Sequence, residues 1–230
     1  MLLRNPFEPP IIARGVAVGL VLALVVAAIG WPLTAATPIP AEVAIIDRVE
    51  VGDTPAVGGT ALVLSYVGHL LPVAAIAAVV AVFARWRWGG WDLGLLLLTV
   101  LGGASVVTGT VKLLTARTRP DEAVVEALSS AFPSGHAVRA AAVYGLIAWL
   151  VLLVARRGWV RLLVPLLAVG AVTLNAFARL ALAAHWPSDV AVGVALGAVW
   201  LATSLYLLRP RSLADARRRA GESAAGESHH

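Results

Sequence analysis

Long runs of apolar residues, separated by short polar segments, dominate the chain. An α-helix needs about 20 predominantly apolar residues to cross the hydrocarbon core of a bilayer. Six runs reach or approach this length: 14–36, 59–83, 92–115, 135–155, 160–181 and 188–208. The first is longer than the apolar core of a signal peptide, so we expect a retained helix. The pattern predicts an all-α, integral membrane bundle of six transmembrane helices.

The composition supports a membrane protein rather than a soluble one. Of the 230 residues, 60% are apolar and 13% are charged, whereas soluble domains carry about 25% charged residues. We expect one membrane domain over residues 1–208. Residues 209–230 are rich in Arg, Ala, Gly and Ser and predict a basic, disordered cytoplasmic tail. The absence of cysteine excludes disulfides, thiolate metal ligands and a cysteine nucleophile.

The distribution of basic residues predicts the orientation in the membrane. With six spans, both termini and the connections 84–91 and 156–161 share one side, which holds most of the 18 basic residues. The positive-inside rule then places both termini in the cytoplasm, and the acidic segment around Glu42 and Asp47 faces outward. Basic residues at membrane depth are costly and usually functional. Five lie at the outer ends of the third, fourth and fifth spans: Lys112, Arg117, Arg119, Arg139 and Arg179.

The third apolar run ends in a pair of cations. Lys112 is the only lysine in the chain. Arg119 follows seven residues later, near the same helix face, before Pro120 ends the helix. A point charge and a planar guanidinium together suit an anionic group. Taken alone, however, this segment favours a simpler interpretation, in which both side chains snorkel to the membrane interface.

The segment Phe-Pro-Ser-Gly-His-Ala, residues 132–137, opens the fourth apolar run. Gly135 lets the backbone approach a ligand closely, and Ser134 with the free amides of a helix N-terminus can hold an anion. His136 would project from the first turn beside this cradle. These residues alone are equally compatible with a capping Ser134 and a merely tolerated His136.

A third polar cluster lies between the last two runs and contains Arg179, His185 and Asp189. Pro187 suits the first turn of the last helix. Asp189, one turn beyond His185, is within reach to accept an imidazole N–H and fix its tautomer. Such a histidine is held ready as a base or a nucleophile. The alternative is a capping aspartate beside an interfacial histidine. His69 has no such companions and is expected to pack or lie at the interface.

All three clusters fall on the predicted outer face of the membrane. Together they supply cations for an anion, a histidine beside a carboxylate, and a second histidine. This set of groups fits phosphoryl transfer without a metal ion. We expect no metal, no other cofactor and no nucleic-acid partner, and the sequence predicts no oligomeric state.

The three clusters resemble the signature of the type 2 phosphatidic acid phosphatase family, whose core is shared with vanadium haloperoxidases. The family pattern is K-x6-RP, PSGH and SR-x5-H-x3-D. It is matched in order by Lys112, Arg119 and Pro120, by residues 133–136, and by Arg179, His185 and Asp189. Ala178 stands where the family usually has serine. Arg117 stands where the family often has arginine.

The resemblance implies a phosphatase that works through a phosphohistidine. It implies that His185 attacks phosphorus, that Asp189 orients His185, and that His136 protonates the leaving group. The phosphate ligands that it implies are Lys112, Arg119, Ser134, Gly135 and Arg179. Arg117 and Arg139 are candidate substrate contacts, although a helix-surface arginine at the interface is an equal alternative for Arg139.

A site at the outer surface of the cell membrane suits a lipid whose phosphorylated head is in water. Isoprenyl pyrophosphate, phosphatidic acid, phosphatidylglycerophosphate and a phosphorylated polyprenyl sugar all fit. The competing prediction is a non-enzymatic channel, transporter or assembly protein whose outer arginines bind anionic lipid heads. That function would not require His136 or the pair formed by His185 and Asp189.

Overall fold

The computed structural model describes residues 9–49, 59–63, 69–88, 92–121, 123 and 129–208. Within these ranges all regular structure is helical. The helices are α1 (Pro9–Ala35), α2 (Pro40–Val49), α4 (Leu70–Trp88), α5 (Asp92–Leu114), α6 (Gly135–Val154), α7 (Gly158–Ala181) and α8 (Pro187–Leu207). The predicted all-α class is therefore confirmed for the described part of the chain.

Five of the described helices are long and apolar enough to cross a membrane. They are Ile11–Ala35, Leu93–Leu114, Gly135–Leu152, Gly158–Ala181 and Pro187–Leu207, and they agree closely with five of the six predicted spans. The predicted second span, 59–83, differs, because residues 59–63 are helical and α4 begins only at Leu70. Residues 64–68 and the predicted tail, 209–230, lie outside the described residues.

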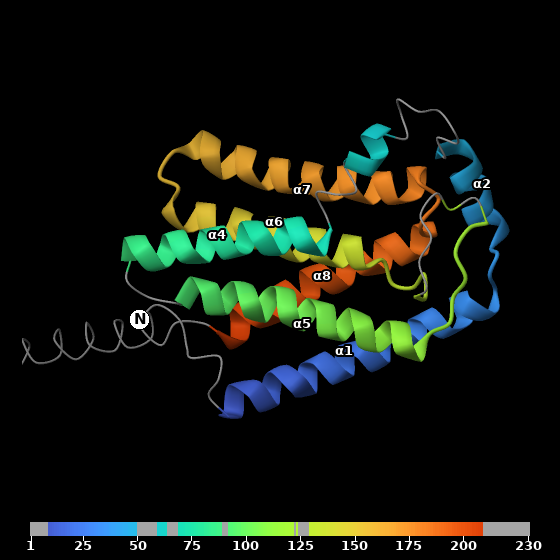
Figure 1. Ribbon diagram of the computed structural model, residues 1–230, viewed down its shortest axis with the longest axis horizontal. Coiled ribbons are helices and arrows are strands. Elements are labelled where there is room, and N and C mark those ends of the chain that lie inside the picture. The colour runs from blue at the N-terminus through green and yellow to red at the C-terminus, as the bar shows by residue number, and fades with distance from the viewer. Residues whose placement is uncertain are drawn as a thin grey trace, which may run out of the picture.

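The long helices lie side by side with their directions alternating along the chain (Figure 1). Helix α6 packs against α5, α7 and α8, and α5 also packs against α1 and α4. The α6–α7 connection lies at one end of the bundle. The segment between α5 and α6, the α7–α8 turn and α2 all lie at the opposite end (Figure 1). Because each of the three sequence clusters is at this second end, the bundle brings them together.

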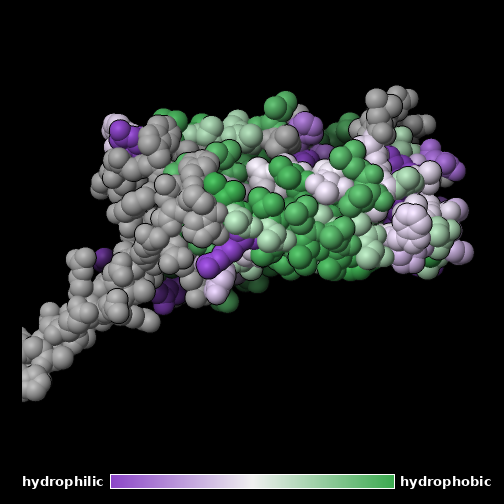
Figure 2. Space-filling model, turned by 90° about the horizontal axis from the view of Figure 1, so that it is seen from below, coloured by the Kyte–Doolittle hydropathy of each residue, from purple (hydrophilic) through white to green (hydrophobic). Residues whose placement is uncertain are grey.

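A broad apolar band covers the middle of the face seen in Figure 2, with hydrophilic residues toward both of its ends. On another side of the bundle, helix α7 also presents apolar surface, because it packs mainly against α6. Its exposed side chains include Trp159, Leu162, Leu166, Leu167 and Phe177. Contiguous apolar surface of this extent is unusual on soluble monomers. It is the surface that a bilayer would cover.

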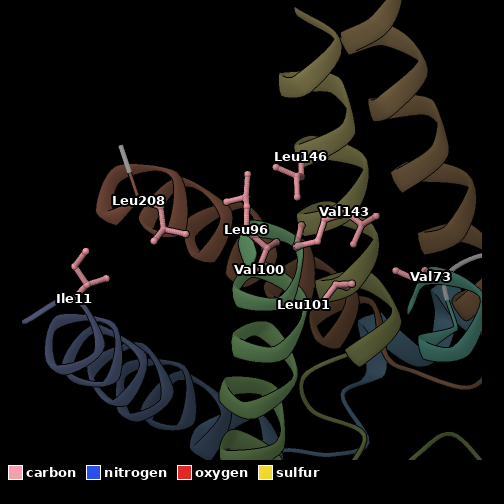
Figure 3. Close-up of a cluster of buried hydrophobic side chains, with 10 residues drawn as sticks. Ile11, Val73, Leu96, Val100, Leu101, Val143, Leu146 and Leu208 are labelled. Carbon is pink, nitrogen blue, oxygen red and sulfur yellow. The ribbon is translucent and has the colours of Figure 1, made fainter. Parts of the chain in front are cut away.

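A buried apolar cluster packs helices of the bundle against one another (Figure 3). Leu96 and Val100 of α5 pack there with Val143 and Leu146 of α6. Ile11 of α1, Val73 of α4 and Leu208 after α8 join the same cluster. Buried apolar packing therefore holds together the helices that carry the three sequence clusters.

Helices α6 and α8 approach each other closely because α8 carries two glycines four residues apart. A Cβ on Gly193 would lie 2.7 Å from the carbonyl oxygen of Ser134, and a Cβ on Gly197 would overlap the carbonyl oxygen of Val138. Small residues at this spacing allow transmembrane helix backbones to touch. The contact at Gly193 sets the start of α6 directly against the first turns of α8.

Candidate active site

The turn between α7 and α8 places His185. The N–H of Ala184 donates to the carbonyl of Arg179 at 3.1 Å, and the N–H of Ala183 donates to the carbonyl of Leu180 at 2.8 Å. These two bonds define a Schellman motif. Ala183 has φ 46°, the left-handed position that glycine usually occupies. The motif ends α7 and reverses the chain immediately before His185.

The imidazole of His185 is buried, with 3% of the residue exposed. Its Nδ1 lies 2.8 Å from the carbonyl oxygen of Ala131 and 3.7 Å from Oδ2 of Asp189. A carbonyl oxygen can only accept, so this contact puts the proton on Nδ1 and leaves a lone pair on Nε2. Burial lowers the pKa of His185 to about 4, and the ring is therefore neutral at neutral pH. The nearest acceptor for Nδ1 is thus a backbone carbonyl, with the predicted carboxylate farther away.

Asp189 connects three parts of the site. Its Oδ1 accepts from Nη1 of Arg117 at 2.6 Å, and its Oδ2 accepts from the backbone N–H of Trp186 at 2.9 Å. Its backbone carbonyl accepts from the N–H of Ser134 at 2.9 Å. Asp189 therefore caps α8, as the simpler interpretation predicted, and also lies beside His185. It joins the start of α8 to the start of α6.

Arg117 is enclosed by polar partners from other segments, with none of its side chain exposed. Its Nε donates to Thr37 Oγ1 at 2.8 Å, and its Nη1 donates to Ser188 Oγ at 2.6 Å. Its Nη2 is paired with the carboxylate of Glu42 on α2. Every guanidinium nitrogen of Arg117 therefore has a protein partner, and two carboxylates, from Glu42 and Asp189, lie against it. The substrate contact predicted for Arg117 stays a prediction.

The segment before α6 is fastened to the end of α5. Lys112 donates through Nζ to the carbonyl of Ser130. The hydroxyl of Thr115 donates to the carbonyl of Phe132 at 3.1 Å and lies 3.2 Å from the hydroxyl of Ser130. Because Phe132 is fully buried, these bonds fix the path of the chain into the predicted anion cradle.

Several donors at the cradle have no hydrogen-bond partner among the described residues. They are Nε of Arg119, Oγ of Ser134 and Nε of Arg139. Ser134 is fully buried, and an Arg139 nitrogen lies 3.2 Å from where a Cβ on Gly135 would stand. Buried polar atoms are rarely left unsatisfied. The oxygens of a bound phosphoryl group would supply the missing acceptors.

Cationic side chains near the cradle act on His185 through electrostatic interactions. The guanidinium groups of Arg119 and Arg179 add to the lowering of the pKa of His185 that burial causes first. Arg119 also donates through Nη1 to the carbonyl of Ala184, the residue that precedes His185. Arg179 is buried in the last turn of α7. Arg119, which follows α5, and Arg179 of α7 therefore both act on the predicted nucleophile.

His136, in the first turn of α6, has a neighbour that the sequence did not indicate. The ring of His69 lies with its centroid 5.6 Å from that of His136, at an interplanar angle of 55°. His69 immediately precedes α4, so a further segment reaches the site. The prediction that His69 packs or lies at an interface did not include this contact, because nothing near His69 in the sequence marks it.

Four residues that support the site were not predicted as part of it: Thr37, Glu42, Ala131 and Ser188. The sequence predicted that Glu42 belongs to an outward-facing acidic segment. It did not show that Glu42 is buried. The sequence gives no local signal that links Glu42 to Arg117, which lies far along the chain. Within the described residues, no group of three or more His, Asp or Glu side chains is arranged to hold a metal ion.

Comparison with known proteins relates the chain to one family. The family model of the PAP2 superfamily matches residues 93–212, which include all three sequence clusters. Phosphatidylglycerophosphatase B of Bacillus subtilis (strain 168) is 34% identical over 134 residues. That alignment covers 56% of this chain and 62% of the relative, so it spans less than two thirds of the relative's length.

Two solved structures share the fold. One is the transmembrane PAP2 type phosphatidylglycerolphosphate phosphatase from Bacillus subtilis, with a TM-score of 0.68 and 23% identity over 82% of this chain and 92% of that one. The other is Aquifex aeolicus LpxE, with a TM-score of 0.54 and 16% identity over 71% of this chain and 94% of that one. The chain is therefore a multi-pass membrane protein. Because the family model covers more than half of the chain, the protein belongs to the PAP2 superfamily.

Proposed function

We propose that this protein is a metal-independent lipid phosphate phosphatase that acts through a phosphohistidine. The observation that carries the proposal is the placement of His185. Its neutral imidazole keeps a lone pair on Nε2, because Nδ1 is held by the carbonyl of Ala131. At the same end of the bundle, Nε of Arg119 and Oγ of Ser134 have no acceptor among the described residues.

In the first step, Nε2 of His185 forms a bond to phosphorus while the bond from phosphorus to the leaving oxygen breaks. His136 donates a proton to that oxygen. The carboxylate of Asp189, 3.7 Å from Nδ1, stabilises the positive charge that develops on the imidazole. The phosphoryl oxygens are held by the proposed ligands Lys112, Arg119, Ser134, Gly135 and Arg179 as charge shifts onto them.

In the second step, water attacks the phosphohistidine. A new bond forms between the water oxygen and phosphorus, and the bond from phosphorus to Nε2 of His185 breaks. His136, now unprotonated, accepts a proton from the water. Inorganic phosphate leaves, and both histidines return to their starting states.

The first candidate substrate is phosphatidylglycerophosphate, because two proteins that resemble this chain carry that activity in their names. Isoprenyl pyrophosphate and phosphatidic acid belong to the same class and remain in the proposal. Arg139 lies one turn after His136, and its Nε has no acceptor among the described residues. We propose that Arg139 contacts a second anionic group on the head of the lipid.

We also propose one membrane domain over residues 1–208 with six spans, both termini in the cytoplasm and the site at the outer face. We propose α4 as the span additional to the five long apolar helices, because it packs against α5 and α6 within the bundle. Arg156 and Arg157, in the α6–α7 connection, lie at the end of the bundle opposite the site (Figure 1). The positive-inside rule places such a connection in the cytoplasm.

The test is phosphate release by the purified full chain in detergent. Phosphatidylglycerophosphate, phosphatidic acid and an isoprenyl pyrophosphate would be compared, each with and without EDTA, and His185→Ala would serve as the inactive control. We expect turnover of at least one lipid that is unchanged by EDTA and absent from the control. Saturable lipid binding without phosphate release would instead support a non-enzymatic lipid-binding or transport protein.

A further inference from the structure

Glu42 is a buried carboxylate on α2, with 7% of the residue exposed. Both of its oxygens are used. Oε2 is paired with Nη2 of Arg117, and Oε1 accepts from the backbone N–H of Ser188 at 2.8 Å. Ser188 directly precedes Asp189, and Arg117 binds Asp189. Glu42 therefore contacts both of the groups that set the position of Asp189.

Buried polar contacts continue from Glu42 to the reactive histidine. Nη1 of Arg117 bonds both Ser188 Oγ and Asp189 Oδ1, each at 2.6 Å. The other oxygen of Asp189, Oδ2, lies 3.7 Å from Nδ1 of His185. The side chains of Arg117 and Asp189 are both fully buried. The ion pair is therefore shielded from bulk water, and protein partners hold its geometry.

The charges in this network favour the reaction proposed for His185. One guanidinium, Arg117, faces two carboxylates, Glu42 and Asp189, so the group as a whole carries one net negative charge. This charge lies behind the imidazole, which becomes positive as Nε2 bonds to phosphorus. If Glu42 were neutral, Arg117 would cancel the charge of Asp189, and the developing cation would lose its counter-charge. The protein interior strengthens such interactions relative to water.

We propose that Glu42 is a positioning residue for His185, which it affects through Arg117 and Asp189. The inference rests on the phosphatase function proposed above. Glu42 does not touch the phosphate cradle through any contact in the described part of the chain. Its removal should therefore alter the chemical step and leave substrate binding unchanged. A simple brace between α2 and α8 would affect stability but not the chemical step.

The first test is Glu42→Gln in the full chain, which removes the charge and keeps the size of the side chain. We expect kcat to fall about 10- to 100-fold, as is typical when a buried partner that orients a reactive group is removed. KM and the inhibition constant for inorganic phosphate should stay within about threefold, since the cradle is untouched. Asp47→Asn is the matched control, because Asp47 is exposed on the same helix, and it should leave kcat unchanged.

The second test is a double-mutant cycle between Glu42→Gln and Asp189→Asn. If Glu42 acts through Asp189, Glu42→Gln should cost less than about threefold in kcat once Asp189 has been changed, because sites in one network are not additive. An undiminished effect of Glu42→Gln in the Asp189→Asn background would overturn the proposal. Thr37→Val, which removes the acceptor of Arg117 Nε, provides a second route if Glu42→Gln fails to fold. It should lower kcat with KM unchanged.

The outcomes separate this inference from the proposed function. A wild-type chain that releases no phosphate from any lipid in the panel would contradict the phosphatase itself. An active wild-type chain whose Glu42→Gln variant matches the Asp47→Asn control would contradict only the role of Glu42. A rise in KM and in the phosphate inhibition constant, with kcat unchanged, would also overturn it, since that result would place Glu42 in substrate binding.

Discussion

Oδ1 of Asp189 lies 2.6 Å from Nη1 of Arg117, and neither side chain is exposed. These residues are 72 positions apart in the chain. Their ion pair fastens the start of α8 to the segment that leaves α5. Removing one partner of a buried pair is costly, because it leaves an unpaired charge away from water. The position of Asp189 beside His185 therefore depends on Arg117 as much as on its own helix.

Asp189→Asn should lower kcat by orders of magnitude while the protein still folds. The amide can keep the cap on Trp186 N–H, and Arg117 keeps Glu42 as a charged partner. The loss comes from the missing counter-charge to His185. In hydrolase triads the equivalent change, which puts the histidine in the wrong tautomer, costs about 10⁴-fold. Phosphate release and thermal unfolding in detergent would be measured together. Near-normal kcat in a folded variant would contradict the role of Asp189.

His136→Ala and His185→Ala should differ in their dependence on the leaving group. A general acid contributes about 10²- to 10⁴-fold, and most for a poor leaving group such as a lipid alkoxide. His136→Ala should therefore cripple lipid hydrolysis but largely spare p-nitrophenyl phosphate, whereas His185→Ala should abolish both, together with any acid-labile phosphoenzyme. Equal losses for both substrates in His136→Ala would show that His136 does not protonate the leaving group.

The pH dependence of kcat/KM should show an acid limb set by His185. Burial lowers the pKa of His185 to about 4, and only the neutral ring can attack phosphorus. Activity should therefore be lost as pH falls through about 4 and not near 6.5, the usual value for histidine. Asp189 raises this pKa against the effect of burial, so Asp189→Asn should move the limb to lower pH. If the acid limb does not move in Asp189→Asn, Asp189 does not influence the pKa of His185.

Gly193→Ala should destabilise the protein, because the added Cβ would lie 2.7 Å from the carbonyl oxygen of Ser134. The backbones of α6 and α8 would have to separate, and the Ser134 segment would move with them. Gly170→Ala is the matched control, since nothing lies within 4 Å of a Cβ at that position of α7. It should be neutral or stabilising by up to about 1 kcal/mol from helix propensity. Thermal unfolding and phosphate release would compare the two variants.

The proposed orientation can be tested in this cysteine-free chain. A cysteine at Asp121, in the segment between α5 and α6, should react with an impermeant thiol reagent added outside intact cells. A cysteine at Gly158, at the start of α7, should not react until the membrane is opened. The reverse pattern would place the site in the cytoplasm.

Hydropathy predicted five of the spans well because the signal is local, since each run of apolar residues carries the information for its own helix. The start of α4 at Leu70 was missed for the same reason, because Ser65, Gly68 and His69 interrupt the largely apolar run 59–83 too briefly to change its mean hydropathy. The spacing of charged and small residues likewise located the three clusters. Because successive helices alternate in direction, the three clusters come to lie at the same end of the bundle.

The supporting contacts could not be predicted because they join distant segments or use the backbone. The acceptor for His185 is the carbonyl of Ala131, which any residue at that position could provide. Glu42 is separated from Arg117 by 75 positions, and only the folded bundle shows that it is buried there. Arg117 matched a family position, but its partners, and so its structural role, came from the tertiary structure.

The hydrogen bond from the N–H of Ser134 to the carbonyl of Asp189 has a consequence for biogenesis. Helix α8 emerges from the ribosome after the other described helices, and it supplies Asp189 as well as the glycine surface against which α6 docks. A nascent chain that has inserted everything up to α7 has its cations and His136 but no completed reaction centre. Phosphohydrolysis should therefore begin only when α8 has been inserted, so that chains whose synthesis has not reached α8 leave lipids untouched.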